Sequence, residues 1–282
     1  MREQQTLRNI ISRGFKWIVY GTPKHITHAS IYQTYPQERL KGKKIIITGG
    51  GRGIGLYIAK KCLSEGAEVL ITGRDEETLH NASVELGNCP YITLNMQNTQ
   101  DFPSFIHEAN EKLHGINCLI NNAGISLHEH SFLDVTPEGF ENQINTNLRG
   151  PYFLSQAFLT YLQSQKVQNA NIIFITSERG LYCDTLPYGL TKAAINSLTA
   201  GLARRYMQEG IRVNAIAPGV TASDMTRIER DDNFYRENSC GKRVFLPEEV
   251  AEVTCFILSE PAACINGHVI PCNQGNHLRS DY

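Results

Sequence analysis

Short apolar runs alternate with longer amphipathic segments along this chain, beginning at Lys44. The first run, residues 44–48, is a continuous isoleucine-rich stretch, which is typical of a strand buried on both faces. Further strand-like runs lie at 68–72, 91–94, 117–121, 171–176, 211–216 and 267–271, with helix-like segments between most of them. These repeated units predict an α/β fold with a single doubly wound parallel sheet and helices on both faces.

A glycine-rich turn, residues 48–55, joins the first strand to the next helix-like segment. Glycines let the backbone turn sharply and approach a ligand closely, and a helix N-terminus presents N–H groups to an anion. The turn therefore predicts a site for the phosphates of a cofactor, with an ordinary turn as the alternative. A phosphate-transferring P-loop is disfavoured, because Leu56 and Tyr57 stand where Lys and Ser or Thr are required. The candidate contacts are Thr48, Gly49, Gly51, Arg52, Gly53, Ile54 and Gly55.

The second strand is followed by Gly73-Arg74-Asp75, at the place where a dinucleotide fold distinguishes its cofactors. A guanidinium binds the 2′-phosphate of NADP, whereas a carboxylate binds the free ribose hydroxyls of NAD. Arg74 and Arg52 favour NADP(H) as the cofactor, and Asp75 leaves NAD(H) possible. The alternative is that both arginines are solvated surface charges.

A serine, Ser177, follows the fifth strand-like run, and a Tyr-x-x-x-Lys pair begins eleven residues later. Tyr188 and Lys192 share one face of a helix, so we expect the ammonium to lower the pKa of the phenol. The same spacing occurs twice more in the chain, so the pair is weak by itself. Only Tyr188 follows a strand-end serine at short range, which predicts acid–base chemistry at this place.

These motifs resemble those of the short-chain dehydrogenase/reductase family over residues 41–276. The glycine turn reads Thr-Gly-x-x-x-Gly-x-Gly, residues 121–124 read Asn-Asn-Ala-Gly, and Asn147 stands ahead of x-x-Gly. The resemblance implies a Rossmann-type fold and reversible hydride transfer between NADP(H) and a carbonyl or secondary alcohol of a small molecule. It implies that Tyr188 exchanges the proton and Ser177 binds the substrate oxygen. Lys192 would hold the ribose, and Asn147 would anchor a relay water.

The resemblance also implies cofactor contacts after the third, fourth and sixth strands. Asn95 stands where relatives commonly carry Asp, and a plain turn residue is its alternative. The Val220 backbone and the Thr221 hydroxyl would fix the nicotinamide carboxamide. The implied contacts are Asn95, Met96, Asn122, Ala123, Gly124, Tyr188, Lys192, Pro218, Gly219, Val220 and Thr221.

Besides Asn95, the chain departs from the family pattern in two further places. The interval between Ser177 and Tyr188 is a little shorter than in many relatives. The resemblance therefore does not predict the conformation of the loop 178–187. Near the C-terminus, residues 273–275 read Asn-Gln-Gly where relatives often have Asp-Gly-Gly. Residues 223–246 correspond to a segment that closes over substrate in relatives. They carry charges of both signs, which do not indicate a class of substrate.

Composition indicates which classes of partner and which cellular compartment to expect. The 282 residues include 27 basic and 28 acidic side chains, a net charge of −1, which predicts no general affinity for nucleic acid. No apolar run approaches the roughly 20 residues that cross a bilayer. Eight scattered cysteines without Cys-x-x-Cys predict reduced thiols rather than disulfides or a metal site, and hence a cytoplasmic protein.

Residues 1–41 precede the fold as an extension, and 42–282 form the dinucleotide-binding and catalytic domain. Leu7, Ile10, Ile11 and Phe15 recur at helical spacing among basic residues, which predicts a basic amphipathic helix. We expect it to pack on the protein's own body or on a partner subunit, with membrane-surface contact as the alternative.

Two other functions remain open. A 3-oxoacyl-[acyl-carrier-protein] reductase would need a basic docking patch, for which Lys166, Arg204 and Arg205 are the candidates. A non-catalytic nucleotide sensor or scaffold would keep the glycine turn without needing Tyr188. The family resemblance also implies a homodimer or homotetramer.

Overall fold

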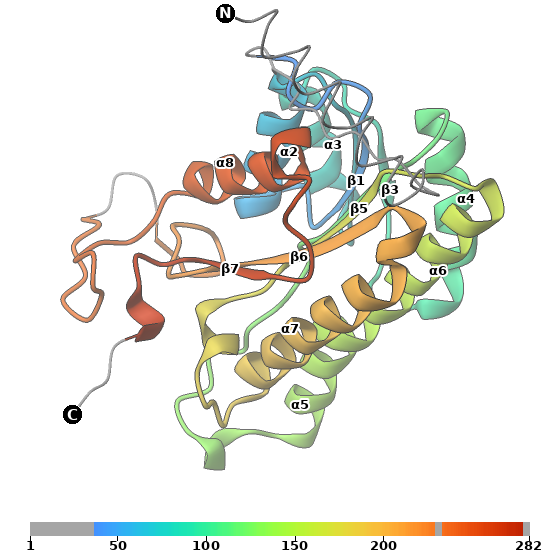
Figure 1. The fold of residues 1–282 in the computed structure, drawn as a ribbon. Helices are drawn as coiled ribbons and strands as arrows, with labels where there is room; N and C mark the ends of the chain where they lie inside the picture. Colours follow the sequence, from blue (N-terminus) through green and yellow to red (C-terminus); the bar gives the residue numbers. More distant parts are fainter. Residues whose placement is uncertain (1–36, 229–232, 279–282) are drawn as a thin grey trace, which may run out of the picture. The chain divides into compact units, whose positions relative to one another are not determined.

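A computed structural model of the chain describes residues 37–228 and 233–278. The predicted N-terminal amphipathic helix lies outside the described residues. A seven-stranded parallel sheet forms the centre, in the order β3-β2-β1-β4-β5-β6-β7 (Figure 1). The strands are β1 (Lys44–Thr48), β2 (Glu68–Gly73), β3 (Tyr91–Thr93), β4 (Cys118–Asn121), β5 (Ala170–Ile175), β6 (Ile211–Pro218) and β7 (Val269–Cys272).

Helices cover both faces of this sheet (Figure 1). On one face lie α2 (Gly53–Ser64), α3 (Glu76–Glu85) and α8 (Pro247–Leu258). On the other lie α4 (Phe102–Leu113), α6 (Gly150–Gln165) and α7 (Pro187–Tyr206). A further helix, α5 (Pro137–Ile144), leads into a π-helical turn, η3 (Asn145–Arg149), and a short 3-10 turn, η4 (Glu178–Leu181), follows β5. The predicted fold class is therefore confirmed.

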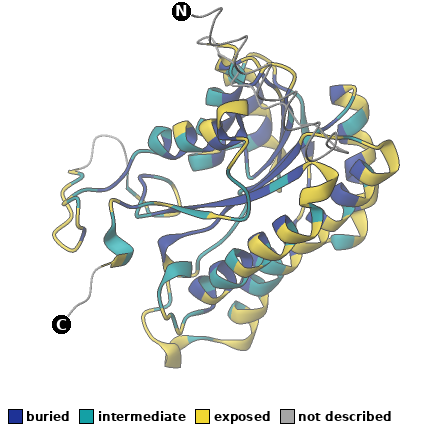
Figure 2. Ribbon diagram, in the orientation of Figure 1, coloured by how far each residue is buried: buried dark blue, intermediate teal, exposed yellow. Residues whose placement is uncertain are grey.

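Alternation along each strand divides the core into two layers. In β1, Ile46 packs with α4 and α6, while Ile45 and Ile47 pack with α2 and α8. All three side chains are fully buried, and Figure 2 shows the buried strands between helices whose outer faces are exposed. A strand covered on both faces needs apolar residues at every position, which explains the unbroken isoleucine run.

The strand order reverses between β1 and β4, which lie side by side in the sheet. β2 and β3 extend to one side of β1, and β5, β6 and β7 extend to the other side of β4. The loops after β1 and β4 therefore diverge to opposite faces and leave a crevice at the carboxyl ends of the strands.

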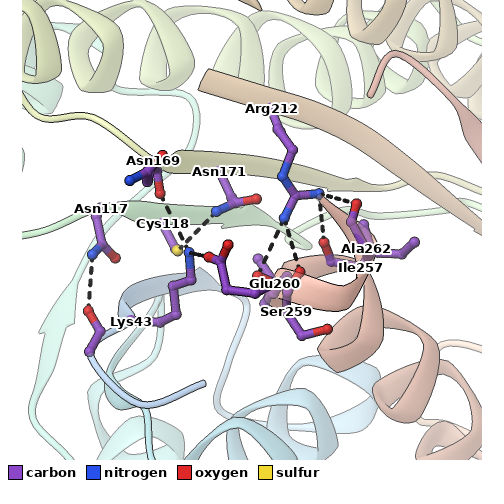
Figure 3. Close-up of polar contacts among 12 residues, drawn as sticks. Lys43, Asn117, Cys118, Asn169, Asn171, Arg212, Ile257, Ser259, Glu260 and Ala262 are labelled. Carbon is purple, nitrogen blue, oxygen red and sulfur yellow. Dashed lines mark hydrogen bonds and ion pairs between the residues drawn. The ribbon is translucent and has the colours of Figure 1, made fainter. Parts of the chain in front are cut away.

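At the opposite, amino end of the sheet, Arg212 of β6 anchors the end of α8 (Figure 3). Its Nη1 donates to the carbonyls of Ile257, Ala262 and Ile265 over 2.9–3.2 Å. Its burial lowers the pKa of this guanidinium. Lys43 also lies here and donates to the Asn169 carbonyl at 3.4 Å. The carbonyls of Ile257 and Leu258 at the end of α8 are thus bound by the Arg212 guanidinium.

None of the helices in residues 37–228 and 233–278 combines the length and the apolar character needed to cross a membrane.

Candidate active site

A cavity of about 630 Å³ opens at the carboxyl ends of the strands, where the strand order reverses. Its walls come from the glycine turn after β1, the ends of β2 and β4, and the start of α7. It brings together most of the cofactor contacts expected from the sequence, namely Thr48, Gly49, Gly51, Arg52, Gly53, Ile54, Arg74, Met96, Asn122, Ala123, Gly124, Tyr188 and Lys192.

The glycine turn is held against the loop after β4 by direct hydrogen bonds. Asn122 Nδ2 donates to the carbonyls of Thr48 at 2.9 Å and Gly49 at 3.1 Å. In return, Thr48 Oγ1 accepts from the backbone N–H groups of Asn122 and Ala123, both at 3.0 Å. The Asn-Asn-Ala-Gly motif therefore fixes the turn's shape as well as lining the cavity.

Two glycines of the turn occupy positions where a Cβ would crowd neighbouring protein atoms. Gly49 has φ +65°, and a Cβ there would come within 3.0 Å of Asn122 Nδ2. A Cβ on Gly55 would overlap the Gly49 carbonyl oxygen, so Gly55 serves the packing of the turn rather than the cavity wall. Arg52 occupies the N-cap of α2, and no side chain of the described residues caps that helix. Its first N–H groups are thus available to a phosphate, so the turn fits the phosphates of a dinucleotide.

The charged residues after β2 have different local roles. Asp75 caps α3 by accepting from the Thr78 N–H at 2.7 Å, and these hydrogen bonds lower the pKa of its carboxyl. Arg74 is exposed and lines the cavity. Arg52 Nε lies 3.6 Å from Asp224 Oδ2, and both side chains are more than half exposed. An ion pair of this kind is weak and easily exchanged.

Lys192 and Tyr188 meet on the first turns of α7. The Lys192 side chain is buried, and its Nζ donates to the Ile175 carbonyl at 2.9 Å and lies 5.6 Å from the centre of the Tyr188 ring. Burial lowers the pKa of Lys192 to about 8. Ser177 caps η4 at the end of β5, and its Oγ accepts from the Arg179 N–H at 3.2 Å.

The expected lowering of the Tyr188 pKa is wrong for the protein without a bound cofactor, because the net shift is upward. Burial raises the pKa of Tyr188, and only the Ser177 hydroxyl and the Arg179 charge oppose that rise. The Lys192 ammonium bonds a backbone carbonyl instead of the phenol oxygen. The helical spacing correctly placed the two residues together, but the spacing carries no information on how deeply the phenol is buried.

Asn147 lies inside the π-helical turn η3, which accounts for an asparagine in a helical stretch. Its Oδ1 accepts from the Ile125 N–H and its Nδ2 donates to the Ile125 carbonyl, both at 2.8 Å. Asn147 Nδ2 also reaches Thr191 Oγ1 at 3.4 Å. A Cβ on Gly124 would lie 3.3 Å from Asn147 Oδ1 and 3.5 Å from Lys192 Nζ, so these two polar groups flank the same glycine.

Several residues expected at the site do not line the cavity in the described part of the chain. Asn95 forms the turn that was its alternative, because its Oδ1 accepts from the Gln97 N–H at 3.0 Å. The Thr221 hydroxyl donates to the Gly219 carbonyl at 3.0 Å. The full set outside the lining is Gly55, Asn95, Asn147, Ser177, Pro218, Gly219, Val220 and Thr221.

Other lining residues were not singled out from the sequence. Thr78 lies three residues beyond Asp75, a spacing that could have indicated a helix cap. Ser126 and His128 follow the Asn-Asn-Ala-Gly motif and line the cavity, as does Arg227 beyond β6. His128 and Arg227 both have positive φ, which no pattern in their sequence indicates.

Comparisons with known proteins agree with this geometry. Residues 43–233 match the family model of the short chain dehydrogenases. The chain is 32% identical to 3-oxoacyl-[acyl-carrier-protein] reductase FabG of Aquifex aeolicus, covering 84% of this chain and 98% of that protein. It is also 32% identical to 3alpha-hydroxysteroid dehydrogenase of Mediterraneibacter gnavus, covering 82% and 95%.

Two solved structures share the fold. One is 3-ketoacyl-(acyl-carrier-protein) reductase from Brucella melitensis complexed with NADH, with a TM-score of 0.78 and 26% identity. The other is a short chain dehydrogenase from Burkholderia cenocepacia in complex with NADP, with a TM-score of 0.76 and 27% identity. Each match covers 84% of this chain and 99% of the other.

Proposed function

This chain belongs to the short-chain dehydrogenase family, and we propose that it transfers a hydride reversibly between NADP(H) and a carbonyl or secondary alcohol of a small molecule. It is an oxidoreductase of the kind that acts on CH–OH and carbonyl groups. One observation carries the finer proposal: a single cavity joins an uncapped glycine turn to Tyr188 and Lys192.

In the proposed mechanism, Tyr188 passes its phenol proton to the substrate oxygen during reduction and takes it back during oxidation. The raised pKa keeps this phenol protonated near neutral pH, which suits the role of a general acid. Ser177 lies outside the cavity lining, but its hydroxyl is near enough to lower the pKa of the Tyr188 phenol, so we assign it to hold the same substrate oxygen. A bound nicotinamide cofactor supplies or accepts the hydride.

Lys192 and Asn147 are assigned to the proton path and to the cofactor. With a pKa of about 8, Lys192 is mostly charged at pH 7 and is suited to hold ribose hydroxyls. Its charge stabilises a phenolate if Tyr188 gives up its proton. Asn147, fixed by two hydrogen bonds to the Ile125 backbone, is assigned to orient a water that returns the proton.

The proposed preference for NADP(H) over NAD(H) rests on the positive charges of Arg74 and Arg52, which line the cavity after β2 and at the glycine turn. The Asp75 carboxylate is already engaged as the cap of α3. Arg52 can exchange its weak pair with Asp224 for a phosphate. Bound ligand stabilises by mass action, so NADPH should raise the melting temperature more than NADH at equal concentration. Arg74→Ala should remove this advantage and leave the NADH shift unchanged; a larger shift with NADH would overturn the preference.

The substrate is tested by NADPH oxidation over a panel of small ketones, steroid ketones and 3-oxoacyl thioesters. The FabG relative makes a 3-oxoacyl-carrier-protein reductase the second candidate. The basic residues expected to bind the carrier protein fit this candidate poorly. Arg204, one of them, lies 16 residues beyond Tyr188 on α7, roughly 24 Å along the helix. A carrier-bound substrate that outperforms its free thioester would favour this candidate. NADPH binding without turnover of any carbonyl would instead favour a sensor or scaffold.

We also propose that the protein is a homodimer or homotetramer. An apolar groove of about 520 Å³ lies between the π-turn, α6 and α7, lined by Ile144, Leu148, Arg149, Tyr152, Phe153, Ala194 and Leu198. Tyr152 and Phe153 are 46% and 37% exposed, which favours their burial against a second copy. The proposed setting is the cytoplasm, which the unpaired buried thiols of Cys62 and Cys118 support.

A further inference from the structure

The residue after Ser177 is a buried carboxylate that the proposed chemistry does not use. Glu178 is 8% exposed, although it opens the short turn η4 beside the site. Its Oε2 accepts from Asn273 Nδ2 and from Asn276 Nδ2, both at 3.1 Å. Burying a charge is costly unless hydrogen bonds compensate it, so this arrangement needs its two amide donors.

Asn276 connects three segments that are far apart in the sequence. Its Nδ2 also donates to the Tyr182 hydroxyl at 3.2 Å, so both amide hydrogens are used. Its Oδ1 accepts from the Cys240 N–H at 3.3 Å. The turn after β5, the segment 233–246 and the C-terminal turn η7 (Asn276–Leu278) therefore meet at one side chain.

Asn273 supplies the second donor from a fully buried position. Its Oδ1 accepts from the Gly275 N–H at 3.2 Å and lies 3.0 Å from His277 Nδ1, while its Nδ2 is left to face Glu178. An aspartate at this place would set a second carboxylate against Glu178. Asn273, in place of an aspartate, is therefore compatible with the Glu178 carboxylate next to Ser177.

The other side of η4 packs against the catalytic helix. A Cβ on Gly180 would come within 2.7 Å of the Lys192 backbone carbonyl carbon, and Asn196 Nδ2 donates to the Gly180 carbonyl at 3.0 Å. Within the turn, the Gly180 N–H donates to the Ser177 carbonyl at 2.9 Å. A displacement of η4 therefore moves Ser177 relative to α7.

We propose that Glu178 is a positioning residue: its carboxylate, held by Asn273 and Asn276, clamps η4 against α7 and so fixes the Ser177 hydroxyl beside Tyr188. This inference rests on the proposed function for its catalytic readout. The C-terminal turn thereby becomes part of the active-site scaffold, and the segment 233–246 is tied to the same point through Cys240.

The first test compares Glu178→Ala with Glu178→Gln. Alanine removes the acceptor, so kcat should fall about tenfold to a hundredfold while the NADPH dissociation constant changes by less than about twofold. Glutamine should restore most of the rate, because a single amide oxygen can accept from both asparagines. Asn276→Ala should lower kcat similarly, and the double variant with Glu178→Ala should be no slower than the slower single one. Additive losses, or an unchanged kcat in folded Glu178→Ala, would overturn the proposal.

Glu65→Ala is the matched control. Glu65 is also a buried carboxylate, paired with Arg39 and Lys61, but it follows α2 at the end remote from the glycine turn. Its replacement should lower the melting temperature and leave kcat unchanged. If Glu65→Ala loses as much kcat as Glu178→Ala, the effect is one of general stability and the positioning role fails.

A second readout needs no turnover and separates this proposal from the proposed function. Amide hydrogen exchange at Arg179 and Gly180 should quicken in Glu178→Ala and remain unchanged in Glu65→Ala, because these N–H groups bond to Ser177. If exchange quickens in Glu178→Ala but the wild type has no carbonyl reductase activity, the positioning role of Glu178 is supported and the proposed function is contradicted. Unchanged exchange would contradict the clamp whatever the activity.

Discussion

Lys192 shows how a single buried side chain links stability and chemistry. It is 5% exposed, and its one hydrogen bond from Nζ in the described structure goes to the Ile175 carbonyl. Burial therefore lowers its pKa to about 8, from an ordinary value of 10.5. The folded protein releases this proton more readily than the unfolded chain does.

The pH dependence of stability follows from that difference. Between about pH 8 and pH 10 the unfolded chain binds more protons at Lys192, so the contribution of this residue to the free energy of unfolding should rise by about 2 kcal/mol. The thiols of Cys89, Cys118, Cys255 and Cys272 act in the opposite direction, because burial raises their pKa values and the unfolded thiols ionise first. Above about pH 10 the raised pKa of Tyr188 opposes the gain, since the unfolded phenol ionises first. Urea unfolding at several pH values should show the free energy of unfolding of the wild type gaining about 2 kcal/mol on that of Lys192→Met between pH 8 and pH 10, because the thiols are common to both proteins. Equal slopes in both proteins would contradict the account.

At this scale the sequence predicts identities better than environments. Ser177, Tyr188 and Lys192 are recognisable because spacing and strand ends limit where such residues can lie. The direction of the Tyr188 pKa was wrong because it depends on burial by the whole fold. Glu178 was missed because its partners lie 95 and 98 residues away, and no local pattern marks that pairing.

At the scale of elements, the turn between β1 and α2 depends on atoms too close to admit a side chain. Gly55→Ala would force a Cβ onto the Gly49 carbonyl oxygen, so we expect a loss of about 2 kcal/mol of stability and weaker NADPH binding. Gly201→Ala in α7 is the control, because nothing lies within 4 Å of its Cβ. It should raise stability by about 0.5–1 kcal/mol and leave NADPH binding unchanged. Thermal unfolding with and without NADPH measures the stability and the NADPH binding of each variant. Equal effects of Gly55→Ala and Gly201→Ala would contradict this role of Gly55.

The anchor of α8 gives a second expectation for an element. Arg212→Met would leave the carbonyls of Ile257, Ala262 and Ile265 without this donor, at a cost of about 2–3 kcal/mol in unfolding free energy. Because Arg212 lies at the amino end of β6, kcat should not change. Arg205→Met, an exposed position late in α7, should shift stability by less than about 0.5 kcal/mol. Denaturant unfolding with activity assays measures both, and a larger effect at Arg205 would refute the anchor.

Strands were the best predicted elements, since a sheet buried on both faces imposes apolar residues at every position. Their ends shifted slightly: β3 stops at Thr93, and β6 continues to Pro218. The π-turn around Asn147 was not predicted, although asparagine is a poor residue for a helix interior. A π-turn depends on which side chains meet across the fold, and helical periodicity does not record it.

At the scale of the whole molecule, the exposed groove between α6 and α7 predicts self-association. Phe153→Glu would put a charge into that apolar surface and should shift the protein toward monomer in light scattering. Val84→Glu, 58% exposed on α3 on the other face of the sheet, should leave the mass unchanged. A wild-type monomer would contradict the proposed assembly.

The parallel sheet and its crevice could be predicted because each strand–helix repeat has one favoured handedness. The substrate could not, since Ser126, His128 and Arg227 reach the cavity from loops without periodic patterns. Residues 1–41, expected to be an extension, remain a prediction, as does the segment 223–246 as the substrate loop.

The most direct measurement compares NADPH binding and carbonyl turnover in the wild type and in Tyr188→Phe. The account predicts similar NADPH affinity for both, because phenylalanine keeps the ring beside Lys192. It predicts a rate at least about a hundredfold lower in the variant, because the proton donor is gone. Turnover that survives in Tyr188→Phe would contradict the central role given to this phenol.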